Sequence, residues 1–386
     1  MKPIYIVSWL FALAVSFVSC DDWLDKTPKD RLYPDVYFKT EDELRLFTNQ
    51  FYNNLVPSAV DIYSESSDLI VKSDLMLEMS GQRIIPDEGN GWNFTALRDI
   101  NFYLQYSHNC TEVNARNRYD GVARFFRAYF YFEKVKRYGD IPWYDKALDS
   151  DDPELYKARD SREFVMQKML EDLDFAIANL PKTKNAYVLT RWTALALKSR
   201  VCLFEGTFRK YHGLEDCEKY LNACVSASET FMNESGYTLY KSGSTPYRDL
   251  FASINLQADE VIFGRDYEAS LSVLHNVQNY ENSTTMGRPG MNKKIVNSYL
   301  MADGSRFTDK AGYETMTFDQ ECQNRDPRLA QTIRTPGYTR IGSTKKEAPN
   351  LAYTMTGYHL IKYSMTANYD EYNKSCNDIP LFRTAE

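Results

Sequence analysis

The sequence has few of the residues on which common enzyme sites are built. Only four histidines are present, and they are scattered along the chain: His108, His212, His275 and His359. There is no HExxH motif, no CxxC pair and no GxSxG elbow. Because zinc proteases, CxxC zinc or redox sites and α/β-hydrolases need these spacings, the sequence gives no support to those classes.

A complete dinucleotide-binding fingerprint is also missing. Residues 89–94 read GNGWNF, which begins like that fingerprint but lacks its third glycine. The stretch follows a Pro-Asp-Glu turn, whereas the fingerprint needs a strand before it and a helix after it. We therefore predict no phosphate site here.

Carboxylates are plentiful, so composition alone leaves a two-carboxylate glycosidase open. Such an enzyme needs two carboxyl groups about 5–9 Å apart across a cleft, which a sequence does not show. Asp151 and Asp152 stand before Pro153 and indicate a solvated turn, while Glu260 precedes an apolar strand and is assigned a structural role. We predict that the protein is not an enzyme and uses no cofactor and no metal.

Blocks of positive charge are absent. The chain has 53 acidic and 46 basic residues, a net charge of −7, and no polybasic run. Binding to nucleic acid or directly to anionic lipid is therefore not expected. Beyond residue 19, no segment is apolar enough to span a bilayer.

The N-terminus is the one long apolar stretch. Lys2 is followed by the uncharged segment 4–18, then by Ser19 and Cys20. The segment fits a secretory signal peptide of residues 1–19 and is shorter than the ~20 apolar residues of a spanning helix. The junction resembles the lipobox of bacterial lipoproteins, although Phe17 stands where leucine is usual. We predict lipidation at Cys20; an ordinary signal peptide with an incidental cysteine is the alternative.

Six further cysteines are present: Cys110, Cys202, Cys217, Cys224, Cys322 and Cys376. An even number in an exported protein permits disulfides, but the spacing is irregular. Cys217 and Cys224 lie two turns apart on one expected helix, roughly 10 Å by helical rise, too far for a bond between them. Most of the six are expected to be buried thiols.

Aromatic residues are unusually frequent. The chain has 29 Tyr, 21 Phe and 5 Trp, which together make 14% of its residues. Tyrosine at this density indicates many half-buried rings with an apolar body and a polar tip. Such rings suit surfaces that stack sugars or hold peptides, and they equally suit helix packing without any ligand.

Helical patterns dominate the first two thirds of the chain. Thr40 and Glu43 form a capping box in front of an apolar face,. Asp160 and Glu163 are read as another helix cap, and the stretch 209–213, RKYHG, as a turn between two helices. The expected helices lie within 40–55, 94–104, 121–139, 160–181, 190–208 and 214–236. Helix pairs joined by short turns are typical of tetratricopeptide-like stacks, although the spacing here is uneven.

From about residue 236 the pattern becomes loop-rich, with short strands such as EVIFG at 260–264. We predict a mainly α fold, with a tetratricopeptide-like helical-hairpin scaffold at 20–235. An irregular region with short strands follows at 236–386.

Nine segments in this order resemble the SusD/RagB family of surface nutrient-binding lipoproteins of Bacteroidota. The resemblance runs from Cys20 to the end of the chain. Its segments read CDDWLDKTP, FFRAYFYFEKVKRYGDIPW, SREFVMQKMLEDLDFAIANLP with TRWTALALKSRVCLFEG, ADEVIFG, NSYLMADG, NRDPRLAQTI, GYHLIKY and DIPLFRTAE. It implies the same helical scaffold and an irregular region that carries ligand-binding surface. Asp21 and Asp22, just after the lipidated cysteine, fit the family's export to the cell surface.

The resemblance also implies a function. Family members capture oligosaccharide or polysaccharide, sometimes peptides, and deliver it to a SusC-like TonB-dependent β-barrel transporter. They are anchored by lipid in the outer membrane, facing the extracellular side. In the family, the motif IPLFRTAE opens a further helix, and this chain stops at Glu386 within it, so we expect a C-terminally truncated form.

Candidate ligand-binding residues are loop aromatics near amide or guanidinium donors, because rings stack on sugars while polar groups read hydroxyls. The alternatives are a packing role for the tryptophan and plain exposed loop for the others. A peptide ligand, or a helical-repeat scaffold that only docks proteins, also stays open. The candidates are Arg83, Asn90, Trp92 and Asn93 in one loop, and His275, Asn279 and Tyr280 in another, with Arg83, Asn90, Trp92, Asn93 and Tyr280 preferred.

Overall fold

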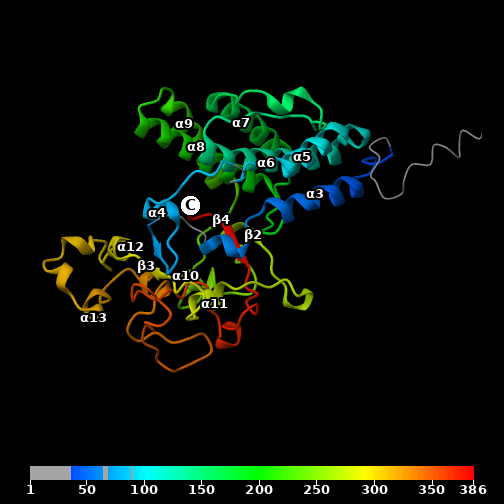
Figure 1. The fold of residues 1–386 in the computed structure, drawn as a ribbon. Helices are drawn as coiled ribbons and strands as arrows, with labels where there is room; N and C mark the ends of the chain where they lie inside the picture. Colours follow the sequence, from blue (N-terminus) through cyan, green and yellow to red (C-terminus); the bar gives the residue numbers. More distant parts are fainter. Residues whose placement is uncertain (1–35, 64–67, 88, 90) are drawn as a thin grey trace, which may run out of the picture.

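The computed structural model describes residues 36–63, 68–87, 89 and 91–386. The predicted signal peptide, the lipidation site Cys20 and the candidate Asn90 lie outside them. The described chain has a layer of long helices, drawn at the top of Figure 1, and an irregular part below it.

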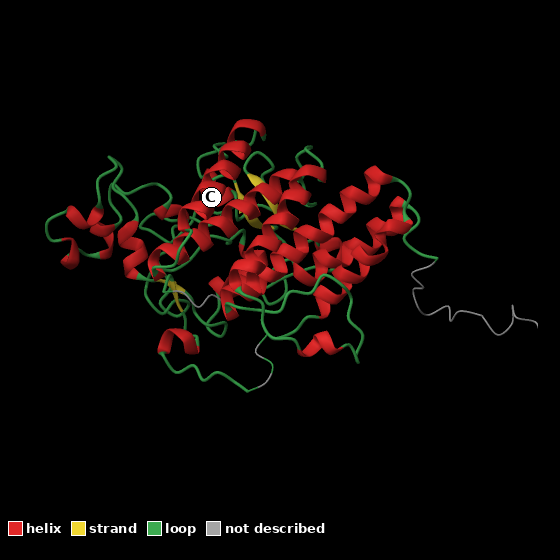
Figure 2. Ribbon diagram, turned by 90° about the horizontal axis from the view of Figure 1, so that it is seen from above, coloured by secondary structure: helices red, strands yellow, loops and turns green. Residues whose placement is uncertain are grey.

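The upper layer is built from six helices in sequence order. Helix α6 is the longest; α3 and α5 pack against it, as does α7, and α7, α8 and α9 then pack each against the next. These helices confirm the mainly α prediction, and Figure 2 shows how few strands accompany them. Their bounds are α3 Glu41–Leu55, α5 Thr95–Tyr106, α6 Val113–Tyr138, α7 Arg162–Asn179, α8 Arg191–His212 and α9 Cys217–Glu234.

Local capping chemistry sets most of the helix ends. The Thr40–Glu43 capping box at the start of α3 is confirmed, with both reciprocal hydrogen bonds present,. The expected cap at Asp160 is wrong: the hydroxyl of Ser161 accepts from the backbone N–H of Phe164 at 3.3 Å. The Asp160 carboxylate instead accepts from the backbone N–H of Trp143 at 2.7 Å, which ties the preceding loop to α7.

The predicted turn at residues 209–213 is also wrong in its position. Arg209, Lys210 and His212 form the last turn of α8, where cationic side chains favour the negative end of the helix,. The helix stops at Gly213, whose φ of +66° is the left-handed conformation that glycine adopts without a steric cost,.

The helices share one hydrophobic core centred on α6. Its members include the fully buried rings of Phe125, Phe126 and Tyr131. Within it lies a buried ion pair, in which Arg127 of α6 donates to both carboxylate oxygens of Asp172 of α7, at 2.6 and 2.7 Å. The two-fold bond satisfies both charges and fixes how α6 and α7 are aligned.

The irregular part contains short elements joined by long loops. Two short antiparallel pairs, β1 with β3 and β2 with β4, are its only sheets among the described residues. The strand predicted at 260–264 is confirmed as β2. The elements are β1 Ile70–Val71, α4 Leu77–Ser80, α10 Pro246–Asp249, β2 Val261–Arg265, α11 Val277–Glu281, β3 Gly290–Met291, α12 Lys293–Ser298, α13 Phe318–Glu321 and β4 Ile379–Arg383.

Buried side chains replace regular ladders as partners for the backbone of this part. The Arg325 guanidinium donates to the carbonyls of Val296 and Tyr299, at 2.7 and 2.8 Å. Arg248 donates to the Ser364 carbonyl at 3.1 Å. Because a buried carbonyl without a hydrogen-bond partner is costly, these arginines stabilise the loops by donating to carbonyls that strand pairing would satisfy in a sheet.

Strands β2 and β4 join the irregular part to the helices. Ile262, Phe263 and Phe382 belong to the same hydrophobic cluster as α6. Glu260, predicted to be structural, is buried, pairs with Arg383 at 2.7 Å and accepts from the backbone N–H of Tyr240 at 2.7 Å. This prediction is confirmed.

The six cysteines within the described residues are all free thiols, and Cys110, Cys202 and Cys376 are buried. No helix in the described part has the length and apolarity to cross a bilayer. Nor do its His, Cys, Asp and Glu side chains gather in a group of three that could hold a metal ion.

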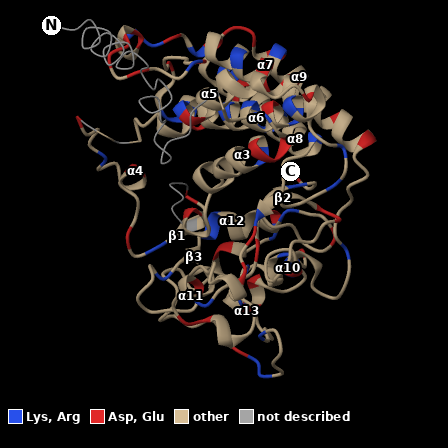
Figure 3. Ribbon diagram, turned by 90° about the vertical axis from the view of Figure 1, so that its right-hand side faces the viewer, with Lys and Arg blue, Asp and Glu red and all other residues tan. Residues whose placement is uncertain are grey.

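Lysines and arginines are interspersed with acidic residues over both parts of the molecule, as Figure 3 shows.

Candidate ligand-binding site

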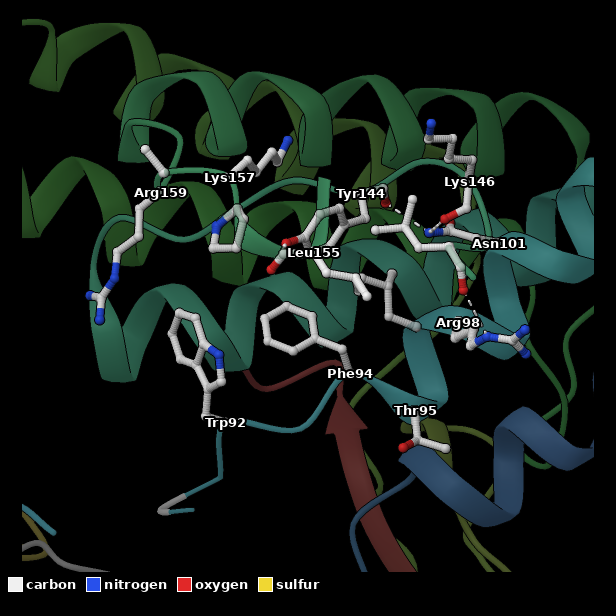
Figure 4. A pocket seen from close by; sticks show the side chains of 14 residues that line it. Trp92, Phe94, Thr95, Arg98, Asn101, Tyr144, Lys146, Leu155, Lys157 and Arg159 are labelled. Carbon is white, nitrogen blue, oxygen red and sulfur yellow. Dashed lines mark hydrogen bonds between the residues drawn. The ribbon is translucent and has the colours of Figure 1, made fainter. Parts of the chain in front are cut away.

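A hollow of about 610 Å³ lies between the N-terminal half of α5 and the loop that follows α6 (Figure 4). Apolar, aromatic and cationic side chains share its wall. The lining residues are Trp92, Phe94, Thr95, Leu97, Arg98, Asn101, Pro142, Tyr144, Lys146, Leu148, Leu155, Lys157, Ala158 and Arg159.

The loop of residues 140–160 forms one wall of the hollow because α5 holds its backbone. The Asn101 side chain donates to the carbonyls of Tyr144 and Lys146, at 2.8 and 3.2 Å. Arg98 donates through Nε to the Leu148 carbonyl at 3.2 Å. Asn101 is itself oriented by Arg127, which donates to its Oδ1 at 3.3 Å. The buried Arg127 ion pair thus supports the floor of the hollow.

Aromatic rings form the opposite wall. Trp92 is 40% exposed and packs edge-on against Phe94 and Tyr138, with ring centroids 5.3 and 4.9 Å away. Phe94 in turn meets Tyr144 edge-on at 5.8 Å. Trp92 therefore does both things the sequence left open: part of the indole packs, and part of it faces the hollow (Figure 4).

Backbone contacts position Trp92 from both sides. The Lys134 ammonium of α6 donates to the carbonyl of Gly91, just before it. After it, the Asn93 side chain accepts at 2.8 Å from the backbone N–H of Thr95, the first residue of α5. Because a turn closed by its own side chain is stiff, the indole is presented on a defined support.

Basic groups dominate the polar part of the lining. Lys157 pairs with Asp160 at 2.9 Å, and Lys146 pairs with Glu154 at 3.0 Å. The Arg159 guanidinium lies over the Trp92 ring, 4.9 Å from its centroid, a distance typical of cation–π contacts.

The one phenol of the lining, Tyr144, stays protonated near neutral pH. Burial raises its pKa, and the nearby carboxylates of Asp160 and Glu154 raise it further. Its hydroxyl donates to the Glu154 carbonyl at 3.1 Å. The ring therefore contributes an apolar face to the hollow and holds the loop through its polar tip.

Of the five preferred candidates, the structure places one in this hollow. Trp92 lines it, and Asn93 lies beside it but is engaged with Thr95. Arg83 lies in an exposed loop, with Nε 3.5 Å from the Glu78 carboxylate. Asn90 lies outside the described residues, and Tyr280 lies elsewhere.

Tyr280 lines a second hollow, of about 370 Å³, together with His275. Burial raises the pKa of Tyr280 to about 12 and lowers that of His275 to about 4. The neutral His275 ring donates through Nε2 to the Asn377 carbonyl at 2.9 Å and accepts from Val277 N–H at 3.1 Å. Asn279 donates to the Asp370 carbonyl at 2.6 Å. His275 and Asn279 thus hold the irregular region together.

The structure adds site residues that sequence reasoning missed, from two places. Arg98 and Asn101 are on α5, in a stretch for which the sequence predicts only a helix. Tyr144, Lys157 and Arg159 are in the loop after α6. The available signal was the Pro142-Trp143-Tyr144 exit from α6, followed by a long loop that mixes aromatic and charged residues. Only the fold places that loop opposite Trp92.

Comparison with known proteins decides the family. Residues 250–386 match the model of the SusD family, and residues 81–191 match the model described as "Starch-binding associating with outer membrane". Together they cover more than half of the chain. The chain belongs to the SusD/RagB family.

Curated relatives agree with this assignment. A SusD-like protein of Formosa agariphila is 26% identical over 294 residues, which are 71% of this chain and 55% of that protein. A second SusD-like protein of the same organism is 24% identical over 226 residues, 53% of this chain and 43% of that protein. The chain spans about half the length of the curated relatives it matches.

Solved structures of SusD-like proteins share the fold. A SusD-like protein from Bacteroides fragilis aligns with a TM-score of 0.71 at 20% identity, covering 93% of this chain and 76% of the other. A SusD-like carbohydrate binding protein from the same species gives 0.72 at 19% identity, covering 90% and 72%. The predicted tetratricopeptide-like scaffold with an irregular, loop-rich region is thereby confirmed for this SusD/RagB protein.

Proposed function

We propose that this SusD/RagB protein captures oligosaccharide or polysaccharide in the hollow beside Trp92, without acting on it chemically. The proposal depends mainly on one observation, the partly exposed Trp92 indole on the wall of an open hollow with hydrogen-bond donors around it. Apolar faces of sugar rings stack on such an indole, while fixed polar groups contact the hydroxyls.

Comparisons support the same ligand class. The family model that matches residues 81–191 is described as starch-binding, and those residues include Trp92 and the whole loop of the hollow. The related structures include a SusD-like carbohydrate binding protein and a surface glycan-binding protein A from Bacteroides fluxus. The bound sugar would lie between Trp92 and the 140–160 loop, which α5 keeps in place.

The cellular role completes the proposal. The protein would be held by lipid on Cys20 in the outer membrane, facing outward, and would pass its sugar to a SusC-like TonB-dependent β-barrel. The family model's description, which mentions association with the outer membrane, supports this location. Affinity purification from detergent extracts, followed by mass spectrometry, tests the partner: a TonB-dependent barrel is expected in the eluate, and a chain eluting alone would contradict it.

Replacing Trp92 tests the glycan site. We expect Trp92→Ala to weaken binding of the best ligand from a panel of neutral and acidic oligosaccharides by about 10-fold or more. The reason is that stacking of a ligand ring on an aromatic side chain contributes roughly 1–3 kcal/mol. Isothermal titration calorimetry measures the affinity, and a thermal melt reports folding separately.

Tyr211→Ala is the matched control, because Tyr211 is an aromatic residue on α8 with 80% exposure that does not line the hollow. It should bind as the parent does. Unchanged affinity for Trp92→Ala with a lowered melting temperature would mean that Trp92 only packs. Binding of peptides in place of sugars would favour the peptide-capture alternative, and binding of neither would favour a protein-docking scaffold.

A further inference from the structure

The hollow beside Trp92 is basic, although the chain carries a net charge of −7. Among the described residues, its lining has no aspartate or glutamate and four cationic side chains: Arg98, Lys146, Lys157 and Arg159. Three of the four have a carboxylate within 4.0 Å. Arg159 is different, because it forms no ion pair with any residue in the part of the chain that the structure describes.

Arg159 is exposed and lies over an aromatic ring, a contact that does not use up its N–H donors. Its guanidinium lies 4.9 Å from the centroid of Trp92. A guanidinium stacked on a ring still presents its N–H groups at its edge, where they fit the two oxygens of a carboxylate. Figure 4 shows this side chain reaching from the loop toward the indole at the mouth of the hollow.

Trp92 and Arg159 together would bind an acidic sugar better than a neutral one. A pyranose ring over Trp92 would bring a ring substituent close to Arg159. A hydroxyl there accepts one hydrogen bond from the guanidinium, whereas a carboxylate or sulfate carries the opposite charge and can accept two such bonds side by side. The carboxylates next to the lining, those of Glu154 and Asp160, are paired with Lys146 and Lys157, which reduces their repulsion of such a group.

We propose that the ligand of this hollow is an acidic oligosaccharide, whose carboxylate or sulfate pairs with Arg159 while a neighbouring ring stacks on Trp92. The inference rests on the glycan-binding function proposed above and specifies its substrate class.

Matched pairs of oligosaccharides test the acidic group itself. The probes are oligogalacturonate with its neutral methyl ester, and a sulfated galactan oligosaccharide with its desulfated form, with a maltooligosaccharide as a further neutral sugar. Calorimetric titration should show at least one acidic member binding about 10-fold tighter than its neutral partner. The preference should shrink as salt is raised, because exposed charges are screened. The probe pair that shows this preference identifies whether the acidic group is a carboxylate or a sulfate.

Three variants test the role of Arg159. We expect Arg159→Met to remove most of the acidic preference, because the acidic sugar loses an ion pair and the neutral partner loses only one hydrogen bond. Arg159→Lys should keep part of the preference. Arg137→Met is the matched control: it removes the same charge from an exposed arginine that lies 5.9 Å from the Tyr138 ring and does not line the hollow. Its acidic preference should equal that of the parent.

Each failure has its own meaning. Neutral sugars that bind as tightly as acidic ones, with Trp92→Ala still weakening binding, would overturn the acidic ligand and leave the glycan function standing. Equal losses in Arg159→Met and Arg137→Met would overturn the pairing, since net charge alone would then explain the preference. If no saccharide binds, the glycan function and this inference both fall.

Discussion

Glu281 is the most unusual single residue of the irregular region. It is buried, and its carboxylate accepts from the Ser364 hydroxyl at 2.6 Å and from the Tyr363 N–H at 3.2 Å. Burial raises its pKa from 4.5 to about 7, although those bonds and the nearby Arg340 and Arg248 pull it down. The folded protein therefore favours the protonated acid more than the unfolded chain does.

The sign of the resulting pH dependence follows from linkage. The stability that this raised pKa contributes is fully present below pH 4.5 and is lost as pH rises through about 7,. We expect Glu281→Gln, which mimics the protonated acid, to lose less stability than the parent between pH 5 and pH 8, by up to about 3 kcal/mol. Urea denaturation at several pH values measures it.

Comparing the pH dependence of stability in Glu281→Gln and in the parent also separates the contribution of Glu281 from that of two buried histidines. Burial lowers the pKa values of His275 and His359 to about 4, so their contribution is lost as pH falls, in the opposite direction,. Both are unchanged in Glu281→Gln and cancel in the difference. Parallel pH curves for the two proteins would contradict the assignment.

At the residue scale, the sequence indicated Trp92 but not its partner Arg159. A tryptophan in a loop rich in glycine and amide side chains stands out in a sequence. Arg159 looks like any exposed arginine, and its meaning depends on a 4.9 Å contact with a ring 67 positions earlier in the chain. The role of Asn101 was hidden for the same reason, since its partners are carbonyls of Tyr144 and Lys146.

At the scale of elements, the contact between α8 and α9 depends on Gly206. A Cβ at this position would lie 2.7 Å from Leu221 Cδ2 and 3.2 Å from the Leu221 backbone nitrogen. Glycine normally weakens a helix by about 1 kcal/mol relative to alanine. Here the close approach of α9 outweighs that cost.

We therefore expect Gly206→Ala to destabilise the protein by about 1–3 kcal/mol, because overpacking costs more than the gain in helix propensity. Chemical denaturation measures the change. Gly121→Ala in α6 is the matched control, since its Cβ would lie 3.3 Å from the Leu180 side chain and an ordinary 3.7 Å from the Ala176 backbone, and a smaller loss is expected. A stabilised Gly206→Ala variant would show that α9 does not approach as closely as described.

Helix existence was predictable at this scale, and helix ends were less so. The cap at Thr40 and the end of the helix predicted within 121–139, at Gly139, have strong local signals and are confirmed, while α6 begins earlier, at Val113. Asp160 and Ser161 are both good capping residues; Ser161 caps the helix because the Asp160 carboxylate accepts a tertiary hydrogen bond from the Trp143 N–H. The polar run 209–212 looked like a turn, but it is the solvated, cationic end of α8.

At the scale of the whole molecule, residues from before the predicted boundary at 235 and 236 take part in the irregular region. Strand β1, from the N-terminal half, pairs with β3, and the backbone N–H of Ala59 donates to Tyr267 at 2.8 Å. The irregular region had no periodic pattern from which to derive its folding, because buried arginines rather than ladders hold it. The boundary at residues 235 and 236 stays a prediction.

The membrane anchor is a prediction at the same scale. We expect Cys20→Ala to move the protein from the membrane fraction to the soluble fraction, since several acyl chains at ~0.8 kcal/mol per buried CH₂ would otherwise hold it. Cell fractionation and immunoblotting measure the distribution. Cys217→Ala, which changes a half-buried cysteine of α9, should stay with the membranes. Retention of both variants would exclude the anchor at Cys20.

The central claim is that sugar binds between Trp92 and the loop after α6. The most direct test is a crystal structure of the protein with the tightest-binding oligosaccharide of the panel. We expect a sugar ring on the exposed face of Trp92, with Tyr144 and Arg159 within contact distance. A sugar bound in the hollow of Tyr280 and His275, with the Trp92 hollow free of ligand, would contradict the claim.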